Sequence, residues 1–222
     1  MRRVGILGGT FNPVHIGHLR LAIEMWQALD LDQVELVPAA WPPHKPERGM
    51  LDFAVRLELL RLAVAGLPML AVNALEAERP GPSYTIDTLE QLNRLRPETE
   101  FFFLMGAGDL LNLHLWKRGF ELERLAHLAV ATRDHLGEAE VSAYIAAHPA
   151  MGFTPDGPRR WAAPSGRCLT LVDIPRLDIS ASFIRERFRH GANLRFLLPA
   201  SVEEALAGNR EVVLSAWFKE FS

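Results

Sequence analysis

The chain has 222 residues, with 24 Lys and Arg against 27 Asp and Glu, and a formal net charge of −3. Hydrophobic residues make up 49% of it and charged residues 23%, which is typical of a globular protein with one sizeable core. The slightly acidic balance excludes the strongly basic surface of a nucleic-acid-binding protein, so we expect no nucleic-acid partner.

The expected compartment follows from cysteine content and hydropathy. Cys168 is the one cysteine of the chain, so no internal disulfide can form, and no Cys and His spacing resembles a structural zinc site. The apolar runs fall far short of the ~20 residues that span a bilayer, and the amino terminus shows no cleavable signal. We expect a cytoplasmic protein without a membrane partner.

Short apolar runs alternate with longer amphipathic segments along almost the whole chain. This alternation is typical of an α/β protein in which helices cover both faces of a parallel sheet. We therefore predict a doubly wound, mostly parallel sheet of about six strands. The expected strands are Val4 to Gly8, Val34 to Pro38, Met69 to Asn73, Phe101 to Met105, Leu128 to Thr132 and Leu169 to Ile174.

Helices are expected between these strands. Apolar residues recur at helical spacing from Ile16 to Leu29 and again from Leu57 to Val64, which indicates two crossover helices. Further helices are expected at about Thr85 to Leu95, Glu138 to Ala147, Ser180 to Arg189 and Ala200 to Ala207.

Two segments depart from this alternation. The stretch from His148 to Cys168 contains four prolines and three glycines, so we expect a long loop, either a lid or a poorly ordered connection. The tail at 209–222, which contains Trp217 and Phe218, is expected to pack on the body or on a partner chain. We therefore predict a single domain over residues 1–208 followed by this tail, with the oligomeric state left open.

The segment after the first strand carries the most chemical information. Two glycines let the backbone approach a ligand closely, and the N–H groups at the start of the following helix can bind a phosphate. His15 and His18 lie on one side of the first helical turn, and Gly17 leaves the space between them open. Both imidazoles can donate hydrogen bonds to phosphate oxygens. The segment reads Gly8-Gly9-Thr10-Phe11-Asn12-Pro13-Val14-His15-Ile16-Gly17-His18-Leu19.

Two other interpretations of this segment compete with phosphate binding. The histidine pair could hold a metal ion, although the Glu that completes a zincin motif is absent. A dinucleotide-binding turn would read Gly-x-Gly-x-x-Gly, which this segment lacks, so a Rossmann dehydrogenase is excluded. The spacing favours a phosphate site.

Two segments of the chain resemble those of the nucleotidylyltransferase superfamily, whose members join a nucleotide to a phosphate with loss of pyrophosphate. Gly9 to His18 resembles its phosphate-binding signature, and Ile179 to Arg185 resembles its late Ile-Ser-Ser-Thr-x-Ile-Arg box. In that box Ser180 or Ser182 can cap a helix, and the arginine in its first turns can bind the same anion. The resemblance implies a Rossmann-like nucleotidylyltransferase fold with a triphosphate site.

Three further segments are similar to those of the bacterial nicotinate-nucleotide adenylyltransferases, which make deamido-NAD from ATP and nicotinate mononucleotide. Pro42 to Lys45 resembles their mobile loop, and Pro82 to Thr88 resembles their nicotinate-binding segment. Gly106 to Asp109 and Trp116 resemble their adenosine and pyridine contacts. Without this resemblance, Pro42 to Lys45 would be interpreted as a proline turn and Pro82 to Thr88 as an ordinary helix start. Trp116 would be interpreted as a core residue.

The resemblance implies a role for each matching residue. The expected catalytic residues are His15, His18 and Arg185. The expected ATP-binding residues are Gly8, Gly9, Thr10, Phe11, Lys45, Gly106, Asp109, Ile179, Ser180 and Ser182. The expected nicotinate mononucleotide-binding residues are Asn12, Ser83, Tyr84, Thr85 and Trp116. We expect no metal ligands from the protein, and Mg²⁺ bound through the phosphates of ATP.

The chain departs from the family pattern at several positions. Asn12 stands where many relatives have Asp, while Ala181 replaces a Ser and Ser182 a Thr. An amide keeps the hydrogen-bonding reach of a carboxylate without its charge, so an obligatory negative role at position 12 is excluded. An extra small residue before Asp109 leaves the register of the Gly-x-Asp element open by one position.

The expected function is adenylyl transfer from ATP to nicotinate mononucleotide in NAD biosynthesis. A sibling adenylyltransferase that uses nicotinamide mononucleotide or phosphopantetheine is the nearest alternative. A non-catalytic nucleotide sensor with the same fold is the alternative from another class. Thr85 and Trp116 are the features that favour the nicotinate acceptor.

Overall fold

The computed structural model describes residues 1–43, 49–132 and 137–218. The chain divides into two compact units, and each is described by itself below. The first unit comprises Met1–Gly8, Leu21–Glu35 and Tyr84–Arg176, and the second comprises Gly9–Arg20, Leu36–Ser83 and Leu177–Ser222. The single domain expected over residues 1–208 stays a prediction.

The strands form one mixed sheet whose hydrogen-bonded order is β3-β2-β1-β4-β5-β8-β7-β6. Strand β2 begins in the first unit and ends in the second. Strands β1, β4, β5 and β8 pair in parallel, as the pattern of apolar runs predicts. All six expected strands are present. The strands are β1 (Arg2–Gly9), β2 (Gln33–Pro38), β3 (Leu70–Val72), β4 (Thr99–Gly106), β5 (His127–Thr132), β6 (Thr154–Pro155), β7 (Arg160–Ala162) and β8 (Cys168–Asp173).

The structure adds two short strands where the sequence predicts a long loop from His148 to Cys168. Strands β6 and β7 form an antiparallel hairpin, and β7 pairs antiparallel with β8. They have only two and three residues, which is too short for an alternating pattern to appear in the sequence. The buried Trp161 of β7 ties this hairpin to the core of the first unit.

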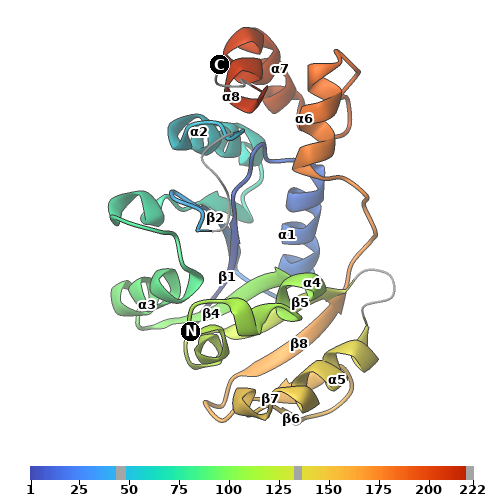
Figure 1. Ribbon diagram of the computed structural model, residues 1–222. Helices are drawn as coiled ribbons and strands as arrows, with labels where there is room; N and C mark the ends of the chain where they lie inside the picture. Colours follow the sequence, from blue (N-terminus) through green and yellow to red (C-terminus); the bar gives the residue numbers. More distant parts are fainter. Residues whose placement is uncertain (44–48, 133–136, 219–222) are drawn as a thin grey trace. The chain divides into compact units, whose positions relative to one another are not determined.

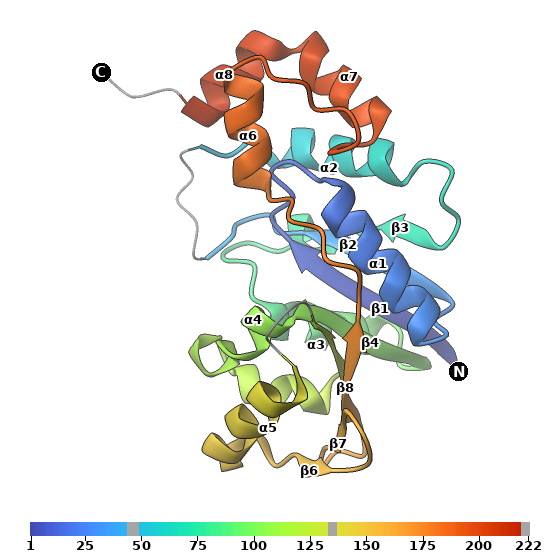
Figure 2. The same ribbon diagram turned by 90° about the vertical axis from the view of Figure 1, so that its right-hand side faces the viewer.

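The helices of the first unit lie on both sides of its parallel strands. Figure 1 shows the second half of α1 (Ile16–Ala28) and α3 (Thr85–Leu95) on opposite sides of β1 and β4. This arrangement confirms the expected doubly wound architecture. Helix α5 (Glu138–Ala147) lies beside the β6–β7 hairpin (Figure 2). The short helices are α4 (Ala107–Leu110), η2 (Leu113–Leu115), η3 (Gly119–Arg124) and η4 (Pro149–Met151).

The second unit is mostly helical. It contains α2 (Phe53–Val64), α6 (Ala181–Arg189), α7 (Ala200–Gly208) and α8 (Arg210–Phe218), together with η1 (Leu75–Glu78). Helix α7 packs on α2, where the Ser201 hydroxyl donates to the Leu62 carbonyl at 3.1 Å (Figures 1 and 2). Among the helices of the described ranges, none is both long enough and apolar enough to cross a membrane.

The strand order predicts a ligand site at one edge of the first unit. The order reverses between β1 and its parallel neighbour β4, and α/β sheets bind ligands at the carboxyl ends of strands at such a switch point. Gly8 lies near the carboxyl end of β1 and Gly106 ends β4. These two predicted site residues therefore lie at the same edge of the sheet.

Candidate functional site

The predicted phosphate-binding loop, residues 9–13 and called the phosphate-binding loop below, has a compact conformation that needs its glycine. Phe11 has a φ of 48°, in the left-handed region that bulky residues rarely adopt, and its side chain is buried. Its ring lies so close over Gly9 that a Cβ there would stand 2.9 Å from Phe11 Cζ. The ring also meets the His18 imidazole edge-on, with 4.9 Å between ring centroids. The glycine at position 9 is therefore explained by close packing against the Phe11 ring.

The two predicted catalytic histidines lie against each other after this loop. Their rings stack with centroids 3.7 Å apart and an interplanar angle of 29°. The backbone N–H of His15 donates to His18 Nδ1 at 3.2 Å, so the neutral His18 ring carries its proton on Nε2. A Cβ on Gly17 would stand 3.0 Å from His15 Nδ1, which explains the glycine at this position. The structure therefore brings this pair together, as the spacing predicts.

The late serine and arginine box also reaches the phosphate-binding loop. The Arg185 guanidinium donates to the Asn12 carbonyl oxygen at 2.8 Å and to the Ser182 hydroxyl at 3.0 Å. Ser180 caps α6, since its hydroxyl accepts from the Phe183 N–H at 3.1 Å. Burial lowers the pKa of Arg185, although an arginine remains charged near neutral pH. The second unit thus gathers the Arg185 guanidinium and the two imidazoles around one loop.

Ile179 completes this group. Its carbonyl oxygen would lie 3.6 Å from a Cβ built on Gly17, so the start of the late box is adjacent to the histidine pair. Lys45, the predicted lysine of the mobile loop, lies at 44–48, outside the described residues. Ser83, predicted to bind nicotinate mononucleotide, belongs to the second unit, where its hydroxyl accepts from the Trp41 N–H at 3.0 Å.

Arg56 is a buried residue of this site that the sequence predictions missed. It is 1% exposed and donates to the carbonyl oxygens of Thr10 at 2.8 Å and Leu51 at 2.9 Å, with a longer contact of 3.5 Å to Ala40. Burial lowers the pKa of Arg56, and the negative charges of Asp52 and Glu76 partly offset this effect. Its signal in the sequence is an arginine within the apolar helix Phe-Ala-Val-Arg-Leu-Glu-Leu-Leu.

The first unit contains the other predicted contact residues. Asp109 lies in the first turn of α4, where its Oδ2 accepts from the Gly106 N–H at 3.3 Å. Trp116 is half-buried and meets the Phe103 ring edge-on at 6.2 Å between centroids. Thr85 is the first residue of α3, which confirms the expected helix start. Gly8 is exposed near the end of β1.

Tyr84 immediately precedes α3 in the first unit. The Lys117 ammonium lies 4.6 Å from the centroid of its ring and also pairs with the Asp87 carboxylate at 2.8 Å. Because both Asp87 oxygens accept from this ammonium, its charge is paired within the first unit. Lys117 was not among the predicted residues, because a lysine directly after Trp116 has no distinctive spacing.

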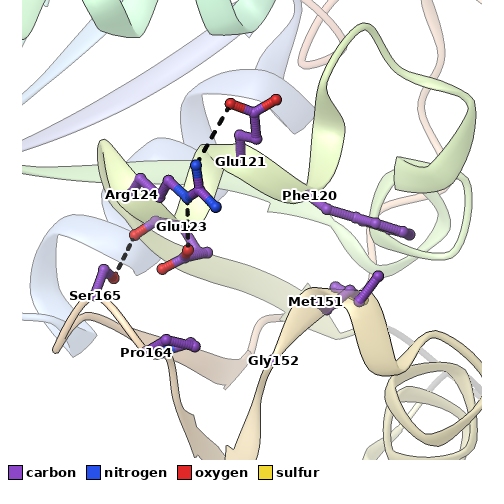
Figure 3. A pocket seen from close by; sticks show the side chains of 9 residues that line it. Phe120, Glu121, Glu123, Arg124, Met151, Gly152, Pro164 and Ser165 are labelled. Carbon is purple, nitrogen blue, oxygen red and sulfur yellow. Dashed lines mark hydrogen bonds and ion pairs between the residues drawn. The ribbon is translucent and has the colours of Figure 1, made fainter.

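The first unit also contains a pocket of about 410 Å³ (Figure 3). The Glu123 side chain is buried there, with its Oε1 atom 3.6 Å from Arg124 Nε. The Ser165 hydroxyl donates to the Glu123 carbonyl oxygen at 2.8 Å. None of the lining residues is a predicted site residue, so the pocket has no part in the predicted site. The lining residues are Phe120, Glu121, Glu123, Arg124, Ala150, Met151, Gly152, Pro164 and Ser165.

Replacement of Arg56 by Met should strongly destabilise the protein. The carbonyls of Thr10 and Leu51 would lose their charged donor, and we expect the free energy of unfolding to fall by about 2–4 kcal/mol. Urea unfolding followed by circular dichroism measures this change. Arg61→Met is the matched control on the same helix, because Arg61 is 60% exposed and pairs with Glu58 only at 3.7 Å. A similar loss in both variants would contradict a stabilising role for the buried Arg56 guanidinium.

Comparison with known proteins assigns the family. A family model described as cytidylyltransferase-like matches residues 6–187. The "Probable nicotinate-nucleotide adenylyltransferase" of Geotalea daltonii is 39% identical over 216 residues, which covers 94% of this chain and 97% of the relative. The protein of the same name from Geobacter metallireducens is 42% identical over 210 residues, with the same coverage of both chains.

Solved structures of low sequence identity show the same fold. The Plasmodium falciparum nicotinic acid mononucleotide adenylyltransferase complexed with NaAD has a TM-score of 0.73 at 15% identity, covering 95% of this chain and 97% of that one. The same protein complexed with APC gives a TM-score of 0.71 over 95% of this chain and 96% of that one. The matched family and relatives agree with the resemblance of the motifs. The chain therefore belongs to the cytidylyltransferase-like family and, within it, to the nicotinate-nucleotide adenylyltransferases.

Proposed function

We propose that the protein transfers AMP from ATP to nicotinate mononucleotide, forming nicotinate adenine dinucleotide and pyrophosphate in NAD biosynthesis. The observation that supports this most is the grouping of His15, His18 and Arg185 around the phosphate-binding loop. These groups donate hydrogen bonds and suit phosphate oxygens. The names of the relatives at 39% and 42% identity supply the substrates.

The reaction is an in-line displacement at the α-phosphorus of ATP. A phosphate oxygen of nicotinate mononucleotide forms a bond to that phosphorus, while the bond to the oxygen that bridges the α- and β-phosphates breaks. The electron pair leaves with pyrophosphate. A phosphate monoester has a second pKa of about 6, so the attacking group is already an anion near neutral pH and no general base is needed.

Catalysis then rests on alignment and on stabilisation of negative charge. We assign His18 Nε2–H to an oxygen of the reacting phosphates, because the His15 N–H already occupies the Nδ1 atom of His18. Arg185 is fixed by the Asn12 carbonyl and Ser182, so it contributes a positioned positive charge at the same loop. Lys45 and the N–H groups of Thr10 and Phe11 are assigned to the triphosphate.

Mg²⁺ is proposed to arrive bound to the phosphates of ATP, where it offsets their charge. Within the described ranges, no group of three or more His, Cys, Asp and Glu side chains could hold a metal ion. The side chains that follow this loop are the imidazoles of His15 and His18. Such donors fit phosphate oxygens better than they fit Mg²⁺, which prefers oxygen ligands and keeps several waters.

The partners we propose are the two small polyanionic substrates, in the cytoplasm and without nucleic acid. For the acceptor, we assign Thr85 at the start of α3 to the nicotinate carboxylate, because the first N–H groups of a helix bind anions. An uncharged amide would gain less from this helix start.

The choice of acceptor is tested by steady-state kinetics with saturating ATP and Mg²⁺. We expect kcat/KM for nicotinate mononucleotide to exceed that for nicotinamide mononucleotide by at least about tenfold, since a charged hydrogen bond is worth more than a neutral one. Phosphopantetheine in the same assay serves as the acceptor of the sibling enzymes. Preference for the amide or for phosphopantetheine would overturn the substrate assignment.

Replacement of His18 by Ala should lower kcat by about 10²–10³-fold, the usual cost of removing one donor that stabilises developing charge. The fold should persist, which circular dichroism and thermal unfolding would show. His190→Ala is the matched control, because His190 is 68% exposed and contacts Glu186 at 3.0 Å. Near-normal turnover of the His18 variant, or an equal loss in both variants, would refute the assigned role.

A further inference from the structure

The side chain of Asn12 is the centre of a hydrogen-bond network within the second unit. It is 6% exposed, and its Nδ2 donates to the Gly49 carbonyl at 2.8 Å. Its Oδ1 accepts from the Leu51 N–H at 3.0 Å and from the Trp217 indole N–H at 2.9 Å. The amide therefore joins the phosphate-binding loop to the segment at 49–51 and to the last described helix, α8.

This network requires an amide and not a carboxylate at position 12. A carboxylate could accept from Leu51 and Trp217, but its second oxygen would face the Gly49 carbonyl oxygen without a proton to share. Such a buried repulsion between two acceptors is unfavourable. The partners of the Asn12 side chain therefore account for the amide at this position.

Trp217 is held rigidly at the other end of the contact. It is 5% exposed, and its ring meets the Phe188 ring of α6 edge-on, with 5.4 Å between centroids and an angle of 84°. The indole N–H is the one polar group of this side chain, and it points to Asn12. Packing against the buried Phe188 ring therefore orients the indole N–H toward Asn12 Oδ1.

Asn12 is held on its main chain as well. Arg185, also on α6, donates to its carbonyl oxygen at 2.8 Å. Two helices from the carboxyl-terminal part of the chain thus contact Asn12. Helix α6 bonds its backbone carbonyl, and helix α8 bonds its side-chain amide. This residue is next to the left-handed Phe11 and three positions before His15, so displacement of its side chain would be transmitted to the histidine pair.

We propose that Trp217 is a positioning residue for the adenylyl transfer, acting through Asn12. Its indole N–H holds the phosphate-binding loop in the conformation that aligns His15 and His18 with the phosphates. The proposal rests on the proposed function for its kinetic consequence. It gives α8, in the tail that the motifs leave unassigned, a part in the reaction without contact with substrate.

The test compares Trp217→Phe with the wild-type full-length protein. Phe keeps the aromatic packing against Phe188 but removes the N–H, so we expect kcat to fall by about fivefold to tenfold. KM for ATP should change less than about twofold, because the phosphate contacts themselves remain. Val213→Ala is the matched control on α8, since Val213 is buried there but makes no side-chain hydrogen bond. It should lower thermal stability and leave kcat unchanged.

A double-mutant cycle separates positioning from general packing. In an Asn12→Ala background, Trp217→Phe should have no further effect on kcat, because the acceptor is already gone. Additive losses, kcat of Trp217→Phe within about twofold of wild type, or an equal loss in Val213→Ala would each overturn the proposal.

A readout that does not depend on turnover distinguishes this proposal from the proposed function. In ¹⁵N-labelled protein, the Trp217 indole resonance is identified by its absence from the Trp217→Phe spectrum. Its exchange with solvent should be slow in the wild type and faster in Asn12→Ala. An inactive wild type with this protected N–H would contradict the proposed function alone. Unchanged exchange in Asn12→Ala would contradict the contact on which positioning depends.

Discussion

The buried guanidinium of Arg56 holds together three segments that are far apart in the sequence. It donates to backbone carbonyls at Thr10 and Leu51 and lies close to that of Ala40, so α2 carries the phosphate-binding loop and the two segments on either side of residues 44–48. The loop needs such external support, because a bulky residue at the φ of Phe11 is unfavourable on its own. The guanidinium groups of Arg56 on α2 and Arg185 on α6 therefore fix the backbone of the loop, which in turn positions the histidine pair.

Fixed placement of a few donors also explains how a chain with a net charge of −3 can bind two polyanionic substrates. Binding in this account depends on a few oriented donors gathered on one loop, and not on an overall positive field. Arg185 illustrates the cost of this arrangement: burial lowers its pKa, and the Asn12 carbonyl and Ser182 hydroxyl fix its direction. Rigid placement limits the reorganisation needed when charge develops in the transition state.

The sequence predicts those features that depend on short stretches of chain. Buried apolar runs mark the six main strands, and the helix starts at Ser180 and Thr85 follow from local capping and helical spacing. The β6–β7 hairpin is missed because its strands are too short for a period to show. Long-range contacts are also missed: Arg56 bonds to Thr10 across 46 positions and Trp217 to Asn12 across 205. Periodicity reports which face of an element is buried, and not which distant group a buried polar atom will meet.

The fate of the α-phosphate of ATP shows whether the protein is an adenylyltransferase. Purified protein would be incubated with Mg²⁺, nicotinate mononucleotide and ATP labelled at the α-phosphorus, and the products separated by chromatography. We expect the label to enter nicotinate adenine dinucleotide, in equal moles with unlabelled pyrophosphate, and only when the acceptor is present. Label that stays in ATP, or that appears as free AMP whether or not the acceptor is added, would contradict adenylyl transfer as the function of this site.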